Sequence, residues 1–252
     1  MKNKLQKKQR KFGLVGKNIN YSFSKKYFTE KFTQNHFHNC DYENYDIENI
    51  KAFTEIIKKS KGLVGLNVTI PYKENVIPFL DKISKNAKKI GAVNCISISK
   101  NKKLKGYNTD FYGFKKSIKP LLKNNHKKAL ILGTGGASKA VAFALKKLNI
   151  EFDFVSRKPS EFEFGYNEIN KGIFDEYQII INTTPIGTFP NISEAPKLDY
   201  SLFTAKHIAF DLVYNPEEST FLKKAKKSGA TTKNGYEMLI NQAEKAWLIW
   251  NK

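Results

Sequence analysis

The sequence is poor in several features that define particular protein classes. Its 252 residues include 2 cysteines, Cys40 and Cys95, which are too few and too isolated for a disulfide framework or a metal site. No apolar run approaches the roughly 20 residues that a membrane-spanning helix needs. The basic opening segment, residues 1–12, lacks the apolar stretch and the cleavage site of a secretory signal. These absences favour a soluble protein of the reducing cytoplasm, and we expect no bound metal.

Arginine is almost absent, although the chain is strongly basic. The 44 lysines and arginines against 23 acidic residues give a formal net charge of +21, yet only Arg10 and Arg157 are arginines. Such a charge raises the hypothesis of nucleic-acid binding. Phosphate readers favour arginine, because its planar guanidinium binds phosphate in a bidentate way, whereas these cations are lysines spread along the whole chain. A solvated cationic surface is the better interpretation, and a nucleic-acid binder is the main rival from another functional class.

The order of apolar and amphipathic segments predicts an α/β protein. Hydrophobic residues make up 40% of the chain and aromatic residues 13%, which is typical of a globular protein. Short apolar runs closed by glycine or proline predict strands, and strands that alternate with helices indicate mostly parallel sheets. We expect strands at residues 11–16, 40–47, 63–70, 91–99 and 102–110, the last two as a hairpin, and within 127–157, 176–185 and 207–216. We expect helices at residues 25–37, 48–59, 82–90, 110–123, 216–228 and 236–251, and one between the two strands of 127–157.

A glycine-rich turn is the first motif with chemical meaning. In the segment ALILGTGGASKA a buried strand leads through Gly133, Gly135 and Gly136 directly into a helix. Glycines permit a tight turn and let backbone N–H groups approach a pyrophosphate at the helix N-terminus. Ser138 replaces the third glycine of the usual pattern, and a glycine-rich turn alone is more often a plain connection. The strand before it, the helix after it and a second strand ending at Ser156 favour a dinucleotide site.

The residues after that second strand indicate which dinucleotide is bound. Enzymes that use NAD place an acidic residue there for the ribose 2′-hydroxyl, whereas enzymes that use NADP have arginine near the 2′-phosphate. This chain reads Ser156, Arg157 and Lys158, with no acid at the tip. Arg157 is the only arginine outside the N-terminal tail, so its position favours NADP over a chance surface cation.

Polar residues of the first half gather where strands are expected to end. They are Ser22, Ser24, Asn67, Thr69, Lys73, Asn94 and Asp110. Asn67 and Thr69 alternate along one strand, so their side chains share a face. Each residue also has a structural explanation, such as helix N-capping by Ser24 or Asp110. Because α/β folds form ligand clefts at the carboxyl ends of strands, the set together predicts a site for a small, hydroxyl-rich substrate.

The motifs of both halves resemble those of the shikimate dehydrogenase family. The likeness runs from about residue 13 to 247 in NVTIPYKE, IGAVN, GYNTD, GTGGASKA, DLVYNP and NGYEMLINQAEKAW, in the order and spacing of the family. The resemblance implies an enzyme of two α/β domains, with an N-terminal open-sheet substrate domain, a Rossmann NADP-binding domain and the active site in the cleft between them. It implies reversible NADPH-dependent reduction of 3-dehydroshikimate to shikimate, on the route to chorismate and the aromatic amino acids.

The resemblance also implies the residues of the site. The substrate residues would be Ser22, Ser24, Asn67, Thr69, Lys73, Asn94, Asp110 and Gln242, with Tyr214 close by. The cofactor residues would be Gly133, Thr134, Gly135, Gly136, Ala137, Ser156, Arg157, Lys158, Leu212 and Gly235. Three positions depart from the family pattern: Tyr21 stands for histidine, Lys25 for proline and Ser156 for asparagine. None of them removes a reacting group.

Lys73 and Asp110 are the predicted catalytic pair. Reduction of a ketone by hydride leaves an alkoxide that needs a proton, and the nicotinamide supplies only the hydride. A lysine near its usual pKa of about 10.4 is not ideally poised as a donor. Partial burial lowers the pKa of a lysine, and a carboxylate partner raises it and orients the ammonium. Lys73 is the predicted proton-handling group, with Asp110 as its partner; which of the two releases the proton stays open.

We therefore expect a substrate domain at residues 1–110, an NADP domain at 111–234 and a last helix, 235–252, that folds back onto the first domain. The expected partners are shikimate or 3-dehydroshikimate and NADP(H), with no membrane and no specific nucleic acid, and the chain is a monomer or a homodimer. The alternatives are a relative that prefers quinate or NAD and a catalytically dead sensor on the same fold. Arg157 argues against NAD, and intact Lys73 and Asp110 argue against the sensor.

Overall fold

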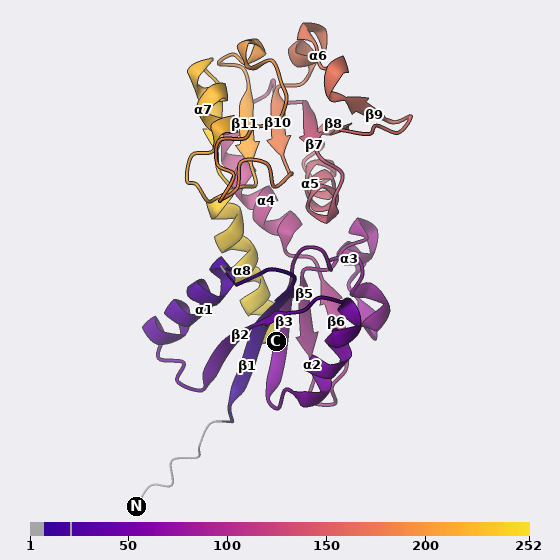
Figure 1. Cartoon of the computed structure of the whole chain (residues 1–252), viewed down its shortest axis with the longest axis vertical. Helices are drawn as coiled ribbons and strands as arrows, with labels where there is room; N and C mark the ends of the chain where they lie inside the picture. The colour runs from indigo at the N-terminus through magenta and orange to yellow at the C-terminus, as the bar shows by residue number, and fades with distance from the viewer. Residues whose placement is uncertain (1–7, 21) are drawn as a thin grey trace, which may run out of the picture. The chain divides into compact units, whose positions relative to one another are not determined.

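The protein consists of two compact units of α/β structure (Figure 1). The computed structural model describes residues 8–20 and 22–252, so Tyr21 and most of the basic tail lie outside the described residues. Unit 1 comprises residues 1–109 and 243–252, and unit 2 comprises residues 110–242. The sequence predicts that the last helix, residues 235–252, folds back onto the first domain, and helix α8 (Tyr236–Trp250) begins in unit 2 and ends in unit 1.

Unit 1 is built on a six-stranded mixed sheet in the order β2-β1-β3-β5-β6-β4. Its strands are β1 (Arg10–Gly16), β2 (Cys40–Asp46), β3 (Leu63–Val68), β4 (Lys82–Ile83), β5 (Cys95–Ile98) and β6 (Leu104–Tyr107). The strand β1 pairs in parallel with β2 and β3, and β5 pairs antiparallel with β3 and β6. The antiparallel pair of β5 and β6 confirms the predicted hairpin.

The helices of unit 1 are short, and their caps explain where they begin. They are α1 (Phe23–Gln34), α2 (Phe53–Lys59) and α3 (Lys85–Ile90), with 3-10 turns at Ile50–Ala52 and Ile77–Phe79. Ser22 caps α1 by accepting from the Ser24 backbone N–H, so the prediction of Ser24 as the N-cap is wrong. Ser84 caps α3, which therefore begins later than the predicted residue 82.

The core of unit 1 has two layers because alternate residues of each strand face opposite sides of the sheet. Phe12 and Leu14 of β1 pack in one layer, with the aromatic residues of α1 and α8. Val15 packs in the other layer, with Leu66 and Val68 of β3. The Trp250 indole N–H donates to the Ile96 carbonyl at 3.0 Å, which anchors the end of α8 to the sheet.

Unit 2 is built on a six-stranded sheet whose pairs are all parallel. Its strands are β7 (Lys128–Leu132), β8 (Glu151–Ser156), β9 (Glu163–Gly165), β10 (Ile179–Asn182), β11 (Ile208–Asp211) and β12 (Thr231–Lys233). They lie in the order β12-β11-β10-β7-β8-β9. Read from β9, this is the 3-2-1-4-5-6 order of a dinucleotide-binding Rossmann fold, with its switch point between β7 and β10. The predicted fold class is confirmed.

Helices cover the sheet of unit 2, so both of its faces are buried. They are α4 (Asp110–Ile118), α5 (Gly136–Lys146), α6 (Lys171–Glu176), α7 (Thr220–Lys227) and the first turns of α8, with 3-10 turns at Lys119–Leu121, Tyr166–Glu168 and Tyr200–Leu202. Ile131 and Ile181 point into one layer of the core, and Leu130 and Ile180 point into the other. Burial on both faces explains the continuous apolar runs of these strands. Within residues 8–20 and 22–252, no helix combines the length and apolarity needed to cross a bilayer.

Candidate active site

Two of the residues expected around the substrate, Asn67 and Asn94, are joined by a hydrogen bond in unit 1. Asn67 lies on β3 and is 4% exposed, and its amide nitrogen donates to the Asn94 carbonyl at 3.3 Å. The Asn94 side chain is also buried, and it accepts from the Thr109 backbone N–H at 2.6 Å. Its amide nitrogen donates to the Thr109 hydroxyl at 2.9 Å. The amides of Asn67 and Asn94 are therefore fixed in orientation by bonds to main chain and side chain.

Tyr42 of β2 joins this network, and the sequence reasoning missed it. Its hydroxyl donates to Oδ1 of Asn67 at 2.9 Å, and the residue is only 1% exposed. Burial raises the pKa of the Tyr42 hydroxyl well above its usual range, while a hydrogen-bonding neighbour, the Ser24 side chain, opposes that rise. In the sequence Tyr42 looks like any aromatic residue of a strand, because its polar partners lie 18 and 25 residues away.

Ser22 and Thr69 are held by backbone bonds close to the strand ends. The Ser22 hydroxyl oxygen accepts from the Ser24 N–H at 3.2 Å and keeps its own proton free for another acceptor. The Thr69 N–H donates to the Val15 carbonyl at 2.9 Å, and the Thr69 carbonyl accepts from Tyr72 at 2.9 Å. Thr69 is thus the first residue of the turn that follows β3 and leads toward Lys73.

The predicted catalytic residues belong to different units. Lys73 lies in unit 1 and is half-buried, and its carbonyl accepts from the Val93 N–H at 2.8 Å. Asp110 opens α4 in unit 2 and is 6% exposed. Gln242 is buried at the last position of unit 2, and Tyr214 is half-buried in the segment after β11.

The turn after β7 has the geometry that a pyrophosphate site needs. Gly133 has φ +103°, and an added Cβ would lie 2.9 Å from Thr184 Cγ2, so a side chain there would be strained. Gly135 caps α5 without any side-chain capping bond, and an added Cβ there would meet no atom within 4 Å. The first turn of α5 carries no acidic residue. Its N–H groups and the positive end of the helix dipole would therefore suit an anion, and the cofactor role of Gly133 to Ala137 stays a prediction.

The segment at the end of β8 presents two exposed cations. The Ser156 hydroxyl oxygen accepts from the Lys158 N–H at 3.2 Å, which folds the segment into a turn with Arg157 at its tip. Both Arg157 and Lys158 are exposed. Burial raises the pKa of the Tyr166 hydroxyl, and the positive charge of Arg157 opposes that rise. These cations, with no acid at positions 156–158, fit a 2′-phosphate.

Leu212 and Gly235 come together at the carboxyl end of β11. The Leu212 N–H donates to the Asn182 carbonyl at 2.9 Å, and the Gly235 N–H donates to Val213 at 3.1 Å. A Cβ on Gly235 would lie 2.1 Å from the Leu212 carbonyl oxygen, so any other residue would push the two segments apart. Close backbone approach explains the glycine in NGYEML.

Asp211 lies beneath this point and was not anticipated. It is fully buried and accepts hydrogen bonds from Asn182 at 2.9 Å, from the Val213 N–H at 3.0 Å and from the Ser219 hydroxyl. Burial raises the pKa of the Asp211 carboxyl to about 7, although the three bonds oppose the rise. Asn182 in turn accepts from Thr184. Asp211 therefore ties together the segments that follow β10 and β11, beside the switch point.

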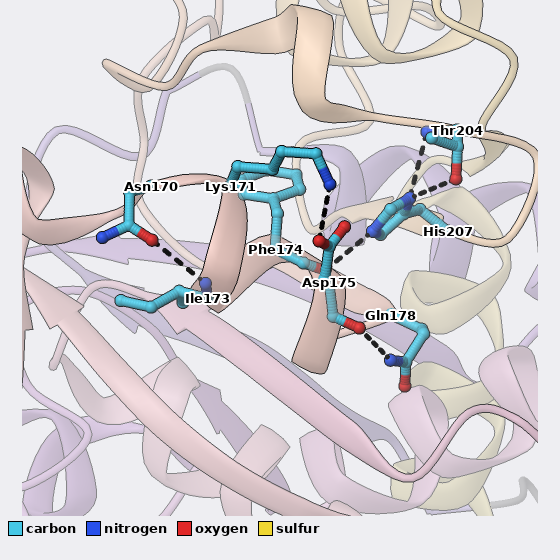
Figure 2. Close-up of polar contacts among 8 residues, drawn as sticks. All are labelled: Asn170, Lys171, Ile173, Phe174, Asp175, Gln178, Thr204 and His207. Atoms are coloured by element: carbon cyan, nitrogen blue, oxygen red, sulfur yellow. Dashed lines mark hydrogen bonds and ion pairs between the residues drawn. The ribbon is translucent and has the colours of Figure 1, made fainter.

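The histidines of the chain lie away from these strand ends. His207 immediately precedes β11, accepts from the Thr204 N–H at 3.0 Å and is 3.0 Å from the Phe174 carbonyl (Figure 2). His126, just before β7, similarly accepts from Lys123 at 2.8 Å. His36 and His38 precede β2. All four stand at amino ends of strands, whereas Rossmann-type sites form at carboxyl ends, so the geometry favours a group other than histidine for proton handling.

Comparisons with known proteins agree with this architecture. Residues 14–96 match the family model described as "Shikimate dehydrogenase substrate binding domain". A shikimate dehydrogenase (NADP(+)) of Caldicellulosiruptor saccharolyticus is 36% identical, over 96% of this chain and 92% of that protein.

Solved structures agree with the sequence matches. A shikimate dehydrogenase crystallised with NADP+ has a TM-score of 0.83 and 34% identity, over 96% of this chain and 90% of the other. A shikimate 5-dehydrogenase of Thermus thermophilus, crystallised with NADP(H) and shikimate, has a TM-score of 0.84 and 29% identity, over 96% and 93%. The identity and coverage confirm the resemblance read from the motifs: this chain belongs to the shikimate dehydrogenase family.

Proposed function

We propose that this chain catalyses the reversible NADPH-dependent reduction of 3-dehydroshikimate to shikimate. The observation that carries the proposal is its likeness, over nearly the whole length, to shikimate dehydrogenases, including structures with NADP and shikimate in their descriptions. Lys73, Asp110 and Arg157 are all present, which supports an active enzyme that uses NADP.

The residues proposed to hold the substrate have polar side chains. They are Ser22, Ser24, Asn67, Thr69, Asn94, Tyr214 and Gln242. Hydroxyl and amide groups suit a substrate rich in hydroxyl groups, because each can donate and accept hydrogen bonds. The buried network of Asn67 and Asn94 supports this assignment, since fixed amides lose little side-chain entropy when a ligand binds.

Residues at the carboxyl ends of the strands of unit 2 would hold the cofactor. The loop from Gly133 through Thr134 and Gly135 to Ala137, including Gly136, holds the pyrophosphate with backbone N–H groups. Ser156, Arg157 and Lys158 hold the 2′-phosphate. Leu212 and Gly235 are the remaining cofactor residues of this proposal. The close approach of their backbones leaves no room for a side chain at position 235.

Lys73 and Asp110 handle the proton. When bound, NADPH would supply the hydride that reduces the carbonyl carbon of 3-dehydroshikimate. The Lys73 ammonium would stabilise the oxygen that gains negative charge, and either this ammonium or a protonated Asp110 carboxyl would supply the proton. The Asp110 carboxylate orients the ammonium. In shikimate oxidation the same pair accepts the proton of the hydroxyl group.

A single assay tests the function. Purified protein is mixed with shikimate or quinate and with NADP or NAD, and reduced cofactor is followed by its absorbance. We expect the highest kcat/KM with shikimate and NADP. A higher kcat/KM with quinate or with NAD would identify the alternative within the family, and no turnover with any pair would contradict the proposal.

A further inference from the structure

Tyr42 is a buried hydroxyl among residues expected to bind substrate, and its ring is rigidly held. The ring stacks on Phe28 with centroids 4.8 Å apart and planes at 10°, and it also contacts Trp250. Parallel pairing of β2 with β1 sets Tyr42 opposite Phe12. The position of the Tyr42 hydroxyl is therefore fixed by the sheet and by the aromatic core.

The hydrogen bonds around Asn67 have only one consistent direction. The Asn94 carbonyl is solely an acceptor, so the Asn67 atom 3.3 Å away must be the amide nitrogen. The other terminal atom, the oxygen, then faces the Tyr42 hydroxyl at 2.9 Å, and Tyr42 must donate to it. Because burial raises the pKa of this hydroxyl, Tyr42 keeps the proton that the bond requires.

Once this orientation is set, the second N–H of the Asn67 amide has no acceptor among residues 8–20 and 22–252. The amide nitrogen carries two hydrogens, of which Asn94 takes one. Without the Tyr42 hydroxyl, the buried Asn67 oxygen would lose its donor, at a cost of about 1–3 kcal/mol. The amide would then be held by Asn94 alone and would be free to tilt away from the orientation in which its other N–H faces the substrate.

We propose that Tyr42 is a positioning residue that holds the Asn67 amide so that its free N–H donates to a hydroxyl oxygen of the substrate. This inference rests on the proposed function, because it takes Asn67 as a substrate residue. Tyr42 touches no reacting atom in this scheme. Its effect should therefore fall on substrate binding, and neither on the proton transfer nor on the cofactor.

The test is Tyr42→Phe, with Tyr45→Phe as the matched control. Tyr45 lies on the same strand, is half-buried and has its hydroxyl 3.3 Å from that of Ser60, away from the network. Tyr42→Phe should raise KM for shikimate about tenfold, as expected for one lost hydrogen bond, and leave kcat and KM for NADP within about threefold. Tyr45→Phe should leave all three constants near wild type.

The outcomes separate this inference from the function itself. Wild-type protein without shikimate turnover would overturn both. An active wild type in which Tyr42→Phe raises KM for shikimate no more than Tyr45→Phe does would overturn the role of Tyr42 alone. An equal rise in KM for NADP would also overturn it, because it would mean a general structural loss.

A second measurement applies even where Tyr42→Phe fails to fold. The side-chain amide protons of Asn67 are followed by NMR in the wild type, with the signals assigned by their loss in Asn67→Asp. Shikimate should shift the proton that is not bonded to Asn94. If neither Asn67 amide proton shifts when shikimate saturates the protein, the proposed donation is wrong.

Discussion

The two units offer their expected binding groups in different ways. In unit 1 the groups are side chains that bind one another, as Tyr42, Asn67 and Asn94 do. In unit 2 they are largely backbone, at the Gly133–Gly135 turn and where Leu212 meets Gly235. A backbone site requires only a strand, a turn and a helix that follow one another in the sequence, with a few glycines. Side-chain networks depend on residues far apart in the sequence, so substitutions in unit 1 should be the more damaging to activity.

The largest effect should come from the predicted catalytic pair. Lys73→Ala should lower kcat by about 10²–10⁴-fold and leave shikimate binding largely intact, because proton transfer matters most in the transition state. Asp110→Asn should also lower the rate sharply and weaken binding. Steady-state kinetics and calorimetric binding of shikimate separate the two effects.

Lys51→Ala is the control, because Lys51 is an exposed lysine of unit 1. It should leave kcat and KM unchanged. Near-normal kcat in Lys73→Ala would reduce Lys73 to a ligand of a substrate hydroxyl group and would leave the proton donor unassigned.

Arg157→Ala should have the next largest effect, and it examines the proposed 2′-phosphate site, where cofactor binding depends on side-chain charge. The variant should raise KM for NADP by about one to two orders of magnitude, matching roughly 1.5–3 kcal/mol for a hydrogen bond to a charged group. KM for NAD should barely change, because NAD has no 2′-phosphate, and Lys158→Ala should act in the same sense more mildly. Equal losses with both cofactors would mean that Arg157 shapes the turn and does not read the phosphate.

The contrast between the units also explains how much could be predicted from the sequence. The α/β class, the long strands of unit 2 and the hairpin of unit 1 follow from local patterns of apolar residues and glycine. The strands β4, β9 and β12 and the helix α6 were not predicted, because each is short and is stabilised mainly by its neighbours. The N-cap of α1 was assigned to Ser24 because local patterns do not distinguish it from Ser22.

The site residues show the same contrast between backbone sites and side-chain networks. The turn from Gly133 to Gly136 could be found because a glycine-rich turn has a recognisable context. Tyr42 and Asp211 could not, because the partners that make them important come from other strands. The pairing of Lys73 with Asp110 stays a prediction, since the two residues belong to different units.

Asp211 predicts a smaller, pH-dependent effect on the stability of unit 2. With a folded pKa of about 7 and an unfolded pKa near 3.9, the folded state binds the extra proton between these values. The contribution of Asp211 to the free energy of unfolding is therefore complete below about pH 4. As the pH rises from there through 7, this contribution is lost by on the order of 1 kcal/mol per pH unit.

Denaturant unfolding of wild type and Asp211→Asn from pH 5 to 8 measures the pH-dependent contribution of Asp211 to the free energy of unfolding. The free energy of unfolding of the wild type should fall relative to that of the variant as the pH rises. Asp199→Asn is the control, because hydrogen bonds from Ser201 lower the pKa of the exposed Asp199 carboxyl. Any pH-dependent stability that Asp199 contributes therefore rises with pH, opposite to that of Asp211. A difference between wild type and Asp211→Asn that stays constant with pH would mean that Asp211 remains ionised throughout.

The smallest expected effect is binding to nucleic acid, despite the net charge of +21. Several exposed lysines of both units are paired with acids, such as Lys103 with Asp81 in unit 1 and Lys171 with Asp175 in unit 2. Binding driven only by counterion release should be indifferent to sequence and should fall steeply between 50 and 200 mM salt, by up to about 10³–10⁵-fold if 6–10 phosphates are contacted.

Fluorescence anisotropy with two unrelated DNA duplexes of equal length measures both properties, with NADP added as a competitor. A tight complex at about 150 mM salt that prefers one duplex would revive the binding-module interpretation. Competition by NADP would then assign that complex to the cations at the end of β8, and its absence would assign it to other lysines.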